Sequence, residues 1–274
     1  MTKQHTILAI DLGTTGNRAL LFNLHGKLMD SEYKEFTQIF PKPAWVEHNP
    51  EEIWRTIFNV IKIVLNRNLD TQIIGIGLTN QRETTILWDK KTGTPLYNAI
   101  VWQCRRTAEA CHGLKQHKDL IKEKTGLFLD PYFSATKIKW ILDNTPNAAS
   151  LLKENRIQFG TIDTWILYKL TQHKSIYTDP SNASRTMIYN IRDNKFDDDL
   201  LSLFEIPKSI LPEVKQSGDH FGNCTLFGGS IPILGILGDQ QASLFAQGGY
   251  TNNQIKNTYG TGLFLVGSTG DKIL

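Results

Sequence analysis

Cysteine is scarce in this chain. Only Cys104, Cys111 and Cys224 occur among its 274 residues, and no two of them form a CxxC pair. An odd number of widely spaced cysteines argues against a disulfide framework. We therefore expect reduced thiols and a cytoplasmic protein.

Long apolar runs and an excess of one charge are also absent. No apolar stretch approaches the roughly 20 residues that a membrane helix needs, and residues 1–5 lead directly into an apolar segment, so we expect neither membrane insertion nor a signal peptide. The 30 Lys and Arg against 27 Asp and Glu give a formal net charge of +3, which offers no basis for binding nucleic acid. Hydrophobic residues at 40% and charged residues at 21% are typical of a globular protein.

A polar turn between two apolar segments stands near the start of the chain. Asp11 ends the apolar run at 7–10, Gly13 and Gly16 bracket two threonines, and Arg18 precedes a second apolar run. We expect a β-hairpin whose turn exposes backbone N–H groups, as anion-binding nests do, and its spacing is not that of a Walker A loop. An ordinary glycine-rich hairpin with a surface carboxylate explains this stretch equally well.

Strands and helices alternate along the rest of the chain. A helix start is marked by Asn49 as the cap and Pro50 in the first position, followed by two glutamates and an apolar stripe at helical spacing. Further strands are expected at 27–36, 73–78, 84–88 and 231–238, and a Gly/Thr turn with an apolar strand within 257–266. A strand leads into a short helix at 159–165, and residues 102–106 lead into a helix that ends at 112. Other helices are expected at 137–142, 148–155, 197–204 and 242–247, and a polar loop at 178–185.

Three apolar strands end on charged residues. Ile10 is followed by Asp11, the strand at 73–78 leads through a polar turn to Arg82-Glu83, and the strand at 231–238 is followed by Asp239. Ligands of open α/β sheets bind outside the carboxyl ends of the strands. Asp239 could instead cap a helix, and Arg82-Glu83 could be a surface ion pair. Three such ends in one chain, together with Gly/Thr turns at 13–16 and 260–262, favour a functional site.

These residues have the chemistry that phosphoryl transfer to an alcohol needs. A carboxylate such as Asp239 can take the hydroxyl proton, Asp11 and Arg18 can meet a metal ion and phosphate charge, and the turns supply backbone donors. Arg82 and Glu83 offer donors and acceptors for adjacent hydroxyls. Three aromatic residues could form an apolar wall, although on base rates each is more often a core residue: Trp102, Tyr132 and Phe264.

Eight stretches resemble the amino-terminal part of the FGGY carbohydrate kinase family, and in particular its glycerol kinases. They run in family order through essentially the whole chain. Two of them, TNQRETT at 79–85 and AIVWQCRRT at 99–107, are closer to the glycerol-phosphorylating members than to pentulose kinases. The other stretches are 11–15, 41–48, 130–134, 181–187, 238–241 and 257–262.

The resemblance implies an actin-like, ribonuclease-H-like α/β fold with a mixed sheet, helices on both faces and two domains around a cleft. A glycerol-binding amino-terminal domain would occupy 1–249, and 250–274 would begin the nucleotide-binding domain. The implied reaction is transfer of the ATP γ-phosphoryl group to glycerol with Mg²⁺, which gives sn-glycerol 3-phosphate. Two alternatives remain: another sugar or polyol kinase of the family, and a non-catalytic actin-like protein. The chain could form a homodimer or a homotetramer.

The resemblance also implies residue roles. Asp239 would be the general base. The glycerol contacts would be Arg82, Glu83, Trp102, Tyr132, Asp239, Gln240 and Phe264. The nucleotide contacts would be Asp11, Thr14, Thr15, Arg18, Gly260, Thr261 and Gly262, with Asp11 and Asp239 at the metal ion.

The chain departs from the family in two places. Leu12 stands where the family turn usually carries Gln, so only a backbone contact to phosphate is expected there. The loop at 226–231 has no Arg or Lys, whereas some bacterial members bind fructose 1,6-bisphosphate through a Gly-rich, Arg-containing loop, so we expect weak or absent inhibition by that ligand. Family members are also roughly twice as long, and we expect little kinase activity and weak ATP affinity from this chain alone.

Overall fold

The first three strands form an antiparallel meander. The computed structural model describes residues 3–260 and 262–273, and in it β1 (Gln4–Leu12), β2 (Gly16–Asn23) and β3 (Leu28–Glu35) pair in sequence order. The hairpin and the third strand predicted from the sequence are therefore confirmed, and the polar Gly/Thr turn connects β1 to β2.

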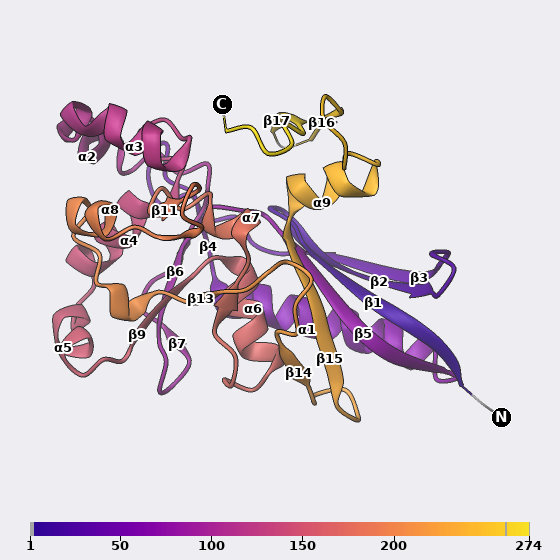
Figure 1. The fold of residues 1–274 in the computed structure, drawn as a ribbon. Coiled ribbons are helices and arrows are strands. Elements are labelled where there is room, and N and C mark those ends of the chain that lie inside the picture. The colour runs from indigo at the N-terminus through magenta and orange to yellow at the C-terminus, as the bar shows by residue number, and fades with distance from the viewer. Residues whose placement is uncertain (1–2, 261, 274) are drawn as a thin grey trace.

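Two later strands extend this meander into a six-stranded mixed sheet. β5 (Thr71–Asn80) and β15 (Ile231–Gly238) run parallel to β1, and the strand order is β14-β15-β5-β1-β2-β3 (Figure 1). Leu12 lies opposite Asn80, and Asn80 lies opposite Gly238. The carboxyl ends of the three parallel strands therefore meet in one row.

Two helices lie side by side beneath this sheet. α1 (Pro50–Arg67) begins after Asn49, whose side chain accepts hydrogen bonds from two N–H groups of the first turn, as the sequence predicts. α6 (Ile162–Leu170) joins it through Trp165, whose Nε1–H donates to the carbonyl oxygen of Pro50 at 3.1 Å. No helix in the described part of the chain has the length and hydropathy of a membrane span.

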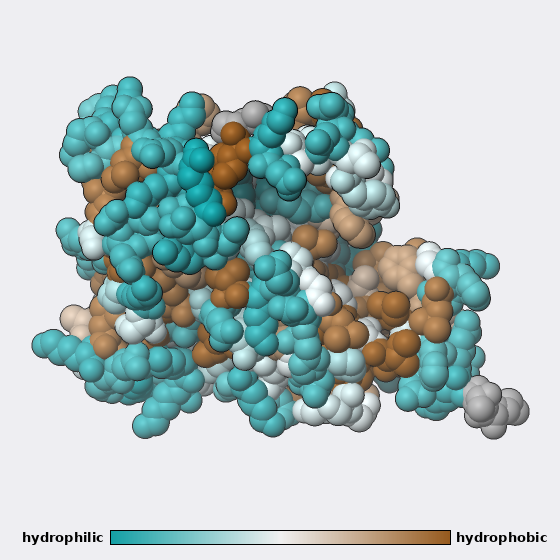
Figure 2. Space-filling view, viewed as in Figure 1, coloured by the Kyte–Doolittle hydropathy of each residue, from teal (hydrophilic) through white to brown (hydrophobic). Residues whose placement is uncertain are grey.

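The helical cover of the sheet is uneven. Leu8 and Ile10 are fully buried in the core that includes α1 and α6. Ile7, Ile74 and Leu234 lie on neighbouring strands and remain exposed on the other face, and Figure 2 shows hydrophobic residues gathered over β5 and β15 there. The mixed α/β class is as expected. Helices were expected on both faces of this sheet, but α1 and α6 pack on one face, while Ile7, Ile74 and Leu234 stay exposed on the other.

A second cluster of buried side chains lies around a three-stranded sheet of order β7-β6-β9. Its helices are those predicted from the sequence, together with α3, which the sequence analysis did not identify. The elements are β6 (Ile86–Asp89), β7 (Thr94–Pro95), β9 (Ile157–Gly160), α2 (Ala108–Gly113), α3 (Lys118–Thr125), α4 (Ser134–Asn144), α5 (Ala148–Lys153) and α8 (Asp198–Leu203).

The segment predicted as a polar loop at 178–185 contains a short helix. α7 (Pro180–Ala183) follows Asp179, whose carboxylate accepts the N–H groups of Ser181 and Asn182. The prediction was wrong because a capping Asp followed by Pro is itself a helix start.

The remaining elements are short: β4 (Glu47–His48), β8 (Ala99–Ile100), η1 (Lys115–His117), β10 (Tyr177–Thr178), β11 (Tyr189–Asn190), β12 (Lys195–Phe196), η2 (Lys208–Ile210), β13 (Glu213–Val214) and β14 (Gly222–Cys224).

A helix and a hairpin follow the last strand of the large sheet. α9 (Asp239–Ala246) starts directly at the end of β15, three residues earlier than predicted. β16 (Ile255–Tyr259) and β17 (Leu263–Gly267) then pair antiparallel and lie against α9 (Figure 1). This hairpin faces the row of strand ends and closes the space above them.

Candidate functional site

A small cavity of about 150 Å³ opens between the strand ends and the hairpin. It contains every side chain that the sequence analysis assigned to glycerol, as well as three of the residues assigned to nucleotide. The lining residues are Thr14, Arg82, Glu83, Trp102, Tyr132, Asp239, Gln240, Thr258, Gly260, Gly262 and Phe264. Residues far apart in the sequence therefore meet at the carboxyl edge of the sheet, as expected for a ligand site.

Arg82, which follows the end of β5, pairs with Asp239, the first residue after β15. Its Nε lies 3.1 Å from Asp239 Oδ1, in an ion pair whose N–H is not aligned as a hydrogen bond, and one terminal nitrogen donates to Gln241 Oε1 at 3.1 Å. The side chain is buried and passes over Gly238, where a Cβ atom would lie 2.6 Å from Arg82 Cδ. A glycine at the end of β15 is therefore required for Arg82 to reach Asp239.

Glu83 is almost completely buried and pairs with a different cation. Its Oε1 accepts a hydrogen bond from Arg185 Nε at 2.7 Å. The alternative of a surface ion pair between Arg82 and Glu83 is wrong, because both side chains are buried and each faces its own partner. Arg185 was not identified as a site residue, although it lies inside the 181–187 stretch that resembles the family.

Asp239 is the first residue of α9, and Gly238 occupies the cap position. The Asp239 Oδ1 accepts the N–H of Gln240 at 2.7 Å, and about a third of the side chain stays exposed to the cavity. The N–H of Gly238 donates to Ser181 Oγ at 2.7 Å, and Ser181 in turn donates to Asp179 at 2.6 Å. The backbone that carries Asp239 is thus fixed from behind, while its carboxylate remains accessible.

Three aromatic rings form one wall of the cavity. The ring centroid of Trp102 lies 5.6 Å from that of Tyr132 and 5.9 Å from that of Phe264, and the indole N–H donates to Thr14 Oγ1 at 2.9 Å. Burial and the Glu83 carboxylate raise the pKa of Tyr132 well above its usual range, so the phenol remains a proton donor. These residues line a site, so the alternative that they are core residues is not supported.

The Gly/Thr turn after β1 is held by amide side chains. Gly13 N–H donates to the Gly16 carbonyl at 3.0 Å, and Gln38 Nε2 donates to the Thr14 carbonyl at 3.1 Å. A Cβ at Gly16 would lie 2.6 Å from the carbonyl oxygen of Lys34 on β3, so the tight turn requires glycine. Leu12 is fully buried in the core and offers no side chain to a ligand, in agreement with the expected loss of a side-chain contact there.

The other proposed nucleotide residues lie around this turn. Arg18 faces Asp11 across the hairpin and stacks on the Tyr33 ring at 5.2 Å, while Thr15 is exposed. Gly260 and Gly262 lie across the cavity on the second Gly/Thr turn. Thr261 lies outside the described residues.

Asp11 and Asp239 are the two carboxylates that could hold a metal ion. Burial raises the pKa of Asp11, the Arg18 charge lowers it, and the Asp239 charge raises it again. Carboxylates that repel each other in this way gain from a cation between them, and Mg²⁺ typically uses one or two carboxylates with water and phosphate oxygens. Within residues 3–260 and 262–273, no group of three or more His, Cys, Asp or Glu side chains could form a metal site by itself. The donor set therefore fits Mg²⁺ and not a fully protein-coordinated metal.

A buried lysine on the hairpin also faces the site. Lys256 on β16 donates to Gln240 Oε1 and, at 2.5 Å, to Thr258 Oγ1. Burial lowers its pKa, and the Asp239 charge acts in the opposite direction. Lys256 has no signal in the sequence, because it lies just before the 257–262 stretch that resembles the family.

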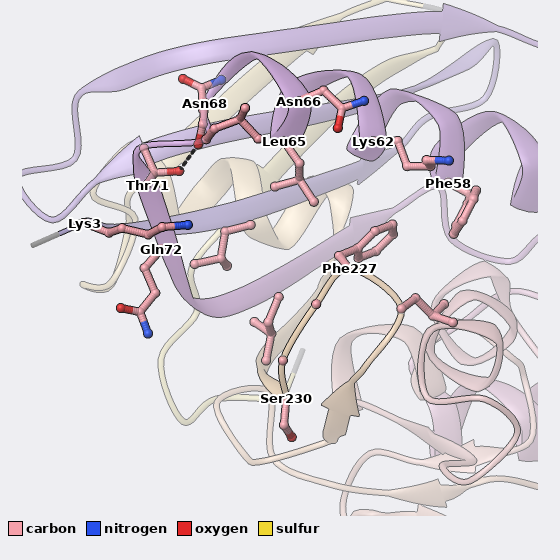
Figure 3. Close-up of a pocket in the computed structure, with 16 residues that line it drawn as sticks. Lys3, Phe58, Lys62, Leu65, Asn66, Asn68, Thr71, Gln72, Phe227 and Ser230 are labelled. Atoms are coloured by element: carbon pink, nitrogen blue, oxygen red, sulfur yellow. Dashed lines mark hydrogen bonds between the residues drawn. The ribbon is translucent and has the colours of Figure 1, made fainter. Parts of the chain in front are cut away.

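A larger cavity of about 630 Å³ lies at the other end of the sheet, between α1, the start of β5 and the loop at 226–231 (Figure 3). Lys3 and Lys62 lie at opposite ends of it, and Phe227 of the loop points into it. The cations there come from α1 and the start of the chain, while the loop itself supplies none. This cavity is remote from Asp239 and shares no residue with the site.

Several known proteins with similar sequences are glycerol kinases. One from Clostridium tetani (strain Massachusetts / E88) is 54% identical over 272 residues, which are 97% of this chain and 55% of that protein. One from Bacillus mycoides (strain KBAB4) is 52% identical over 273 residues, with the same coverage of both chains. The chain spans about half the length of the curated relatives it matches.

Solved structures share the fold. Plasmodium falciparum glycerol kinase with ADP has a TM-score of 0.90 and 36% identity, covering 96% of this chain and 54% of that one. A xylulose kinase from Lactobacillus acidophilus has a TM-score of 0.85 at 22% identity. These likenesses confirm the actin-like α/β fold expected from the sequence.

A sequence model described as the N-terminal domain of the FGGY family of carbohydrate kinases matches residues 6–246. The match begins in β1 and ends with α9, so it includes all three strand ends and Asp239. Because it extends over most of the chain, the chain belongs to the FGGY family of carbohydrate kinases.

Proposed function

We propose that the protein carrying this chain transfers the γ-phosphoryl group of ATP to glycerol. The observation that carries this proposal is the composition of the 150 Å³ cavity, in which three charged side chains face a wall of three aromatic rings. The charged groups offer hydrogen bonds to hydroxyls, and the rings suit the carbon side of a small polyol. The similarity to glycerol kinases of Clostridium and Bacillus supports the same assignment.

In this proposal the polyol is oriented by groups whose positions are already fixed. Arg82 donates to one hydroxyl, and the Glu83 carboxylate, held by Arg185, accepts from its neighbour. Tyr132 and Trp102 pack against the carbon chain. A preorganised set of donors and acceptors of this kind brings the third hydroxyl close to Asp239 in a single orientation.

Asp239 acts as the general base. Its carboxylate takes the proton of the terminal hydroxyl as that oxygen attacks the γ-phosphorus. The new O–P bond forms as the bond between the γ-phosphorus and the bridging β,γ-oxygen breaks, and ADP leaves with the electron pair. The Arg82 ion pair holds the carboxylate in place during the transfer.

The two Gly/Thr turns face the phosphates in this proposal. The phosphate contacts would come from Thr14 and Thr15 on the first turn, from Asp11 and Arg18 on the flanking strands β1 and β2, and from Gly260 and Gly262 on the second turn, with Thr261, which lies outside the described residues, between them in the sequence. Mg²⁺, held by Asp11 and Asp239, would neutralise phosphate charge when bound.

In the same proposal, residues 1–249 would form the glycerol-binding domain, and residues 250–274 would form the start of the nucleotide-binding domain. Three free, buried cysteines support a cytoplasmic location.

The test combines glycerol binding with turnover. Glycerol binding is measured by calorimetry, and glycerol-dependent ADP release is measured on the complete protein that carries this chain. Asp239→Asn keeps the shape of the side chain and removes the base, so we expect kcat to fall by about 10²- to 10⁴-fold while the glycerol dissociation constant changes much less.

The matched control is Asp143→Asn, which alters a surface carboxylate paired with Lys139 on α4 and should leave both quantities unchanged. Full activity in Asp239→Asn would contradict the assignment of the base. An absence of heat from glycerol, with heat from a larger sugar instead, would favour another sugar kinase of the family.

A further inference from the structure

A lysine without any exposed surface lies directly behind the polyol cavity. Lys137 is on the first turns of α4 and is among the largest fully buried side chains. Burying an ammonium group is costly unless it is hydrogen-bonded, and a cation near the N-terminus of a helix is disfavoured further by the helix dipole. Burial of a lysine at this position therefore costs free energy, which its hydrogen bonds must offset.

The bonds made by Lys137 go to the backbone of two site residues. Its Nζ donates to the carbonyl oxygen of Tyr132 at 2.7 Å and to that of Glu83 at 3.4 Å. Tyr132 and Glu83 both line the cavity, and they come from different segments of the chain. One buried side chain thus links the two segments that carry the aromatic wall and the acceptor carboxylate.

The backbone at Glu83 needs such support. Its φ is +60°, and the N–H of Thr84 donates to the carbonyl of Arg82 at 2.7 Å, which closes a three-residue turn around Glu83. A γ-turn with positive φ is rare and strained for a residue other than glycine. Such a conformation persists only where the surroundings hold it.

The support converges on the Glu83 carbonyl oxygen. Besides Lys137, it accepts hydrogen bonds from Ser134 Oγ at 3.1 Å and from Thr85 Oγ1 at 3.1 Å. Ser134 and Lys137 both belong to α4, so the helix reaches the strained turn at two points. The direction in which the Glu83 carboxylate points depends on this anchoring.

We propose that Lys137 is a positioning residue of the polyol site, which fixes the Glu83 turn and the Tyr132 segment relative to each other. This inference rests on the proposed binding of glycerol at the cavity. Burial lowers the pKa of Lys137 to about 7, while the nearby Glu83 carboxylate opposes that effect. The amine donates hydrogen bonds in either protonation state, so its role does not depend on its charge.

Two variants of the complete protein test the proposal. Lys137→Met keeps a similar volume and removes every donor, so we expect the dissociation constant and the KM for glycerol to rise about 10- to 100-fold. Lys137→Gln keeps one donor group but is one atom shorter and cannot reach both oxygens, so we expect a smaller rise, of about tenfold or less. In both variants kcat should stay within about threefold and the KM for ATP should not change.

The control is Lys169→Met, which alters a largely buried lysine on α6 that pairs with Glu51 away from the cavity. It should leave the glycerol constants unchanged. A merely structural role of Lys137 would lower the melting temperature and the fraction of active protein without changing the KM for glycerol. A folded Lys137→Met protein with an unchanged glycerol constant would overturn the proposal.

If Lys137→Met does not fold, Lys137→Gln is the test of the proposal. An unchanged dissociation constant and KM for glycerol in that variant would contradict it. These outcomes are separate from failure of the proposed function. That failure would be seen in the parent protein, as a lack of glycerol binding or turnover.

Discussion

Arg82 and Glu83 are neighbours in the chain, yet each depends on a residue contributed by a distant segment. Arg82 pairs with Asp239 and Glu83 with Arg185, and all the charges except that of Asp239 are largely removed from water. Removal of one member of such a pair leaves an uncompensated buried charge, which costs far more than a surface pair. The site is therefore sensitive to single substitutions at positions that look polar and ordinary in the sequence.

The Gly/Thr turn after β1 is linked to a buried histidine. His48 Nε2 lies 2.8 Å from Gln38 Oε1, and Gln38 also holds the carbonyl of Thr14. The contact with the Gln38 oxygen assigns the proton to Nε2. Nδ1 then has no hydrogen-bond partner among the described residues, so a second proton there would be buried and unpaired. Burial accordingly lowers the pKa of His48 to about 4.

Because of His48, we expect the free energy of unfolding to fall in acid. The unfolded chain binds a proton at His48 below about pH 6.5, whereas the folded chain resists protonation down to about pH 4. The contribution is fully present above pH 6.5 and is lost as the pH falls through 4, with a total of roughly 3 kcal/mol. Urea unfolding of the parent and of His48→Gln at pH 7, 5 and 4 measures it.

We expect the free energy of unfolding to fall less steeply with acid in His48→Gln than in the parent. Asp163, whose pKa burial raises to about 6, acts in the opposite direction, but it is present in both proteins and cancels in the comparison. Parallel pH curves for the two proteins would show that His48 does not carry the effect.

At the scale of secondary structure, the sequence predicts well those elements whose signals are local. Asn49 and Pro50 mark the start of α1, and the apolar runs at 73–78 and 231–238 are β5 and β15. Charged residues at their ends correctly indicated the edge where the cavity lies. These features depend on caps, turns and hydrophobic patterns within a few residues.

The sequence could not identify residues whose role depends on tertiary contacts. Lys137 looks like a surface lysine of an amphipathic helix, and Lys256 like a polar residue of an edge strand, yet both are buried beside the site. Arg185 becomes a site residue only because α7 brings it to Glu83. The family resemblance supplied the roles of the other side chains, which periodicity alone left undecided.

The junction of β15 and α9 gives a prediction at the scale of an element. In Gly238→Ala the new Cβ would lie 2.6 Å from Arg82 Cδ, so Arg82 must move away from Asp239. We expect the glycerol dissociation constant to rise about tenfold or more, the scale of one hydrogen bond to a charged group, with a small change in melting temperature. Calorimetry and thermal unfolding measure the two effects.

Gly235→Ala is the matched control within the same strand. Its Cβ would meet only the Ser217 carbonyl oxygen at an ordinary distance of 3.6 Å, so glycerol binding should be unaffected. If both variants lost glycerol binding equally, the cause would be a change in the strand and not the displacement of Arg82.

At the scale of the whole molecule, the β16–β17 hairpin has two unlike faces. Lys256, Thr258 and Phe264 point toward α9 and the cavity. The opposite face exposes a row of large apolar side chains, each more than 60% accessible: Ile255, Tyr259, Leu263 and Leu265. Contiguous apolar surface of this kind favours association between molecules. In the described part of the chain β16 and β17 pair only with each other, so their outer edges add to this tendency.

We therefore predict concentration-dependent self-association of the 274-residue chain in solution. Leu265→Lys places a charge in the middle of the apolar row and should shift sedimentation velocity profiles toward the monomer. Leu24→Lys is the control, because Leu24 is an exposed leucine in the turn between β2 and β3, far from the hairpin. Identical sedimentation of the parent and Leu265→Lys across concentrations would contradict a role for this face.

The alignment of the strand ends has a consequence for how the chain folds. Leu12 and Asn80 pair between strands in the first part of the sequence, whereas Gly238 pairs with Asn80 across the whole intervening chain. Contacts between residues so distant in the sequence form slowly, because a long loop must first close. We therefore expect Gly238 and Asp239 to join the row after Leu12 and Asn80. If glycerol binds as proposed, its binding would report completion of the sheet and would separate the native state from partly folded forms that lack β15.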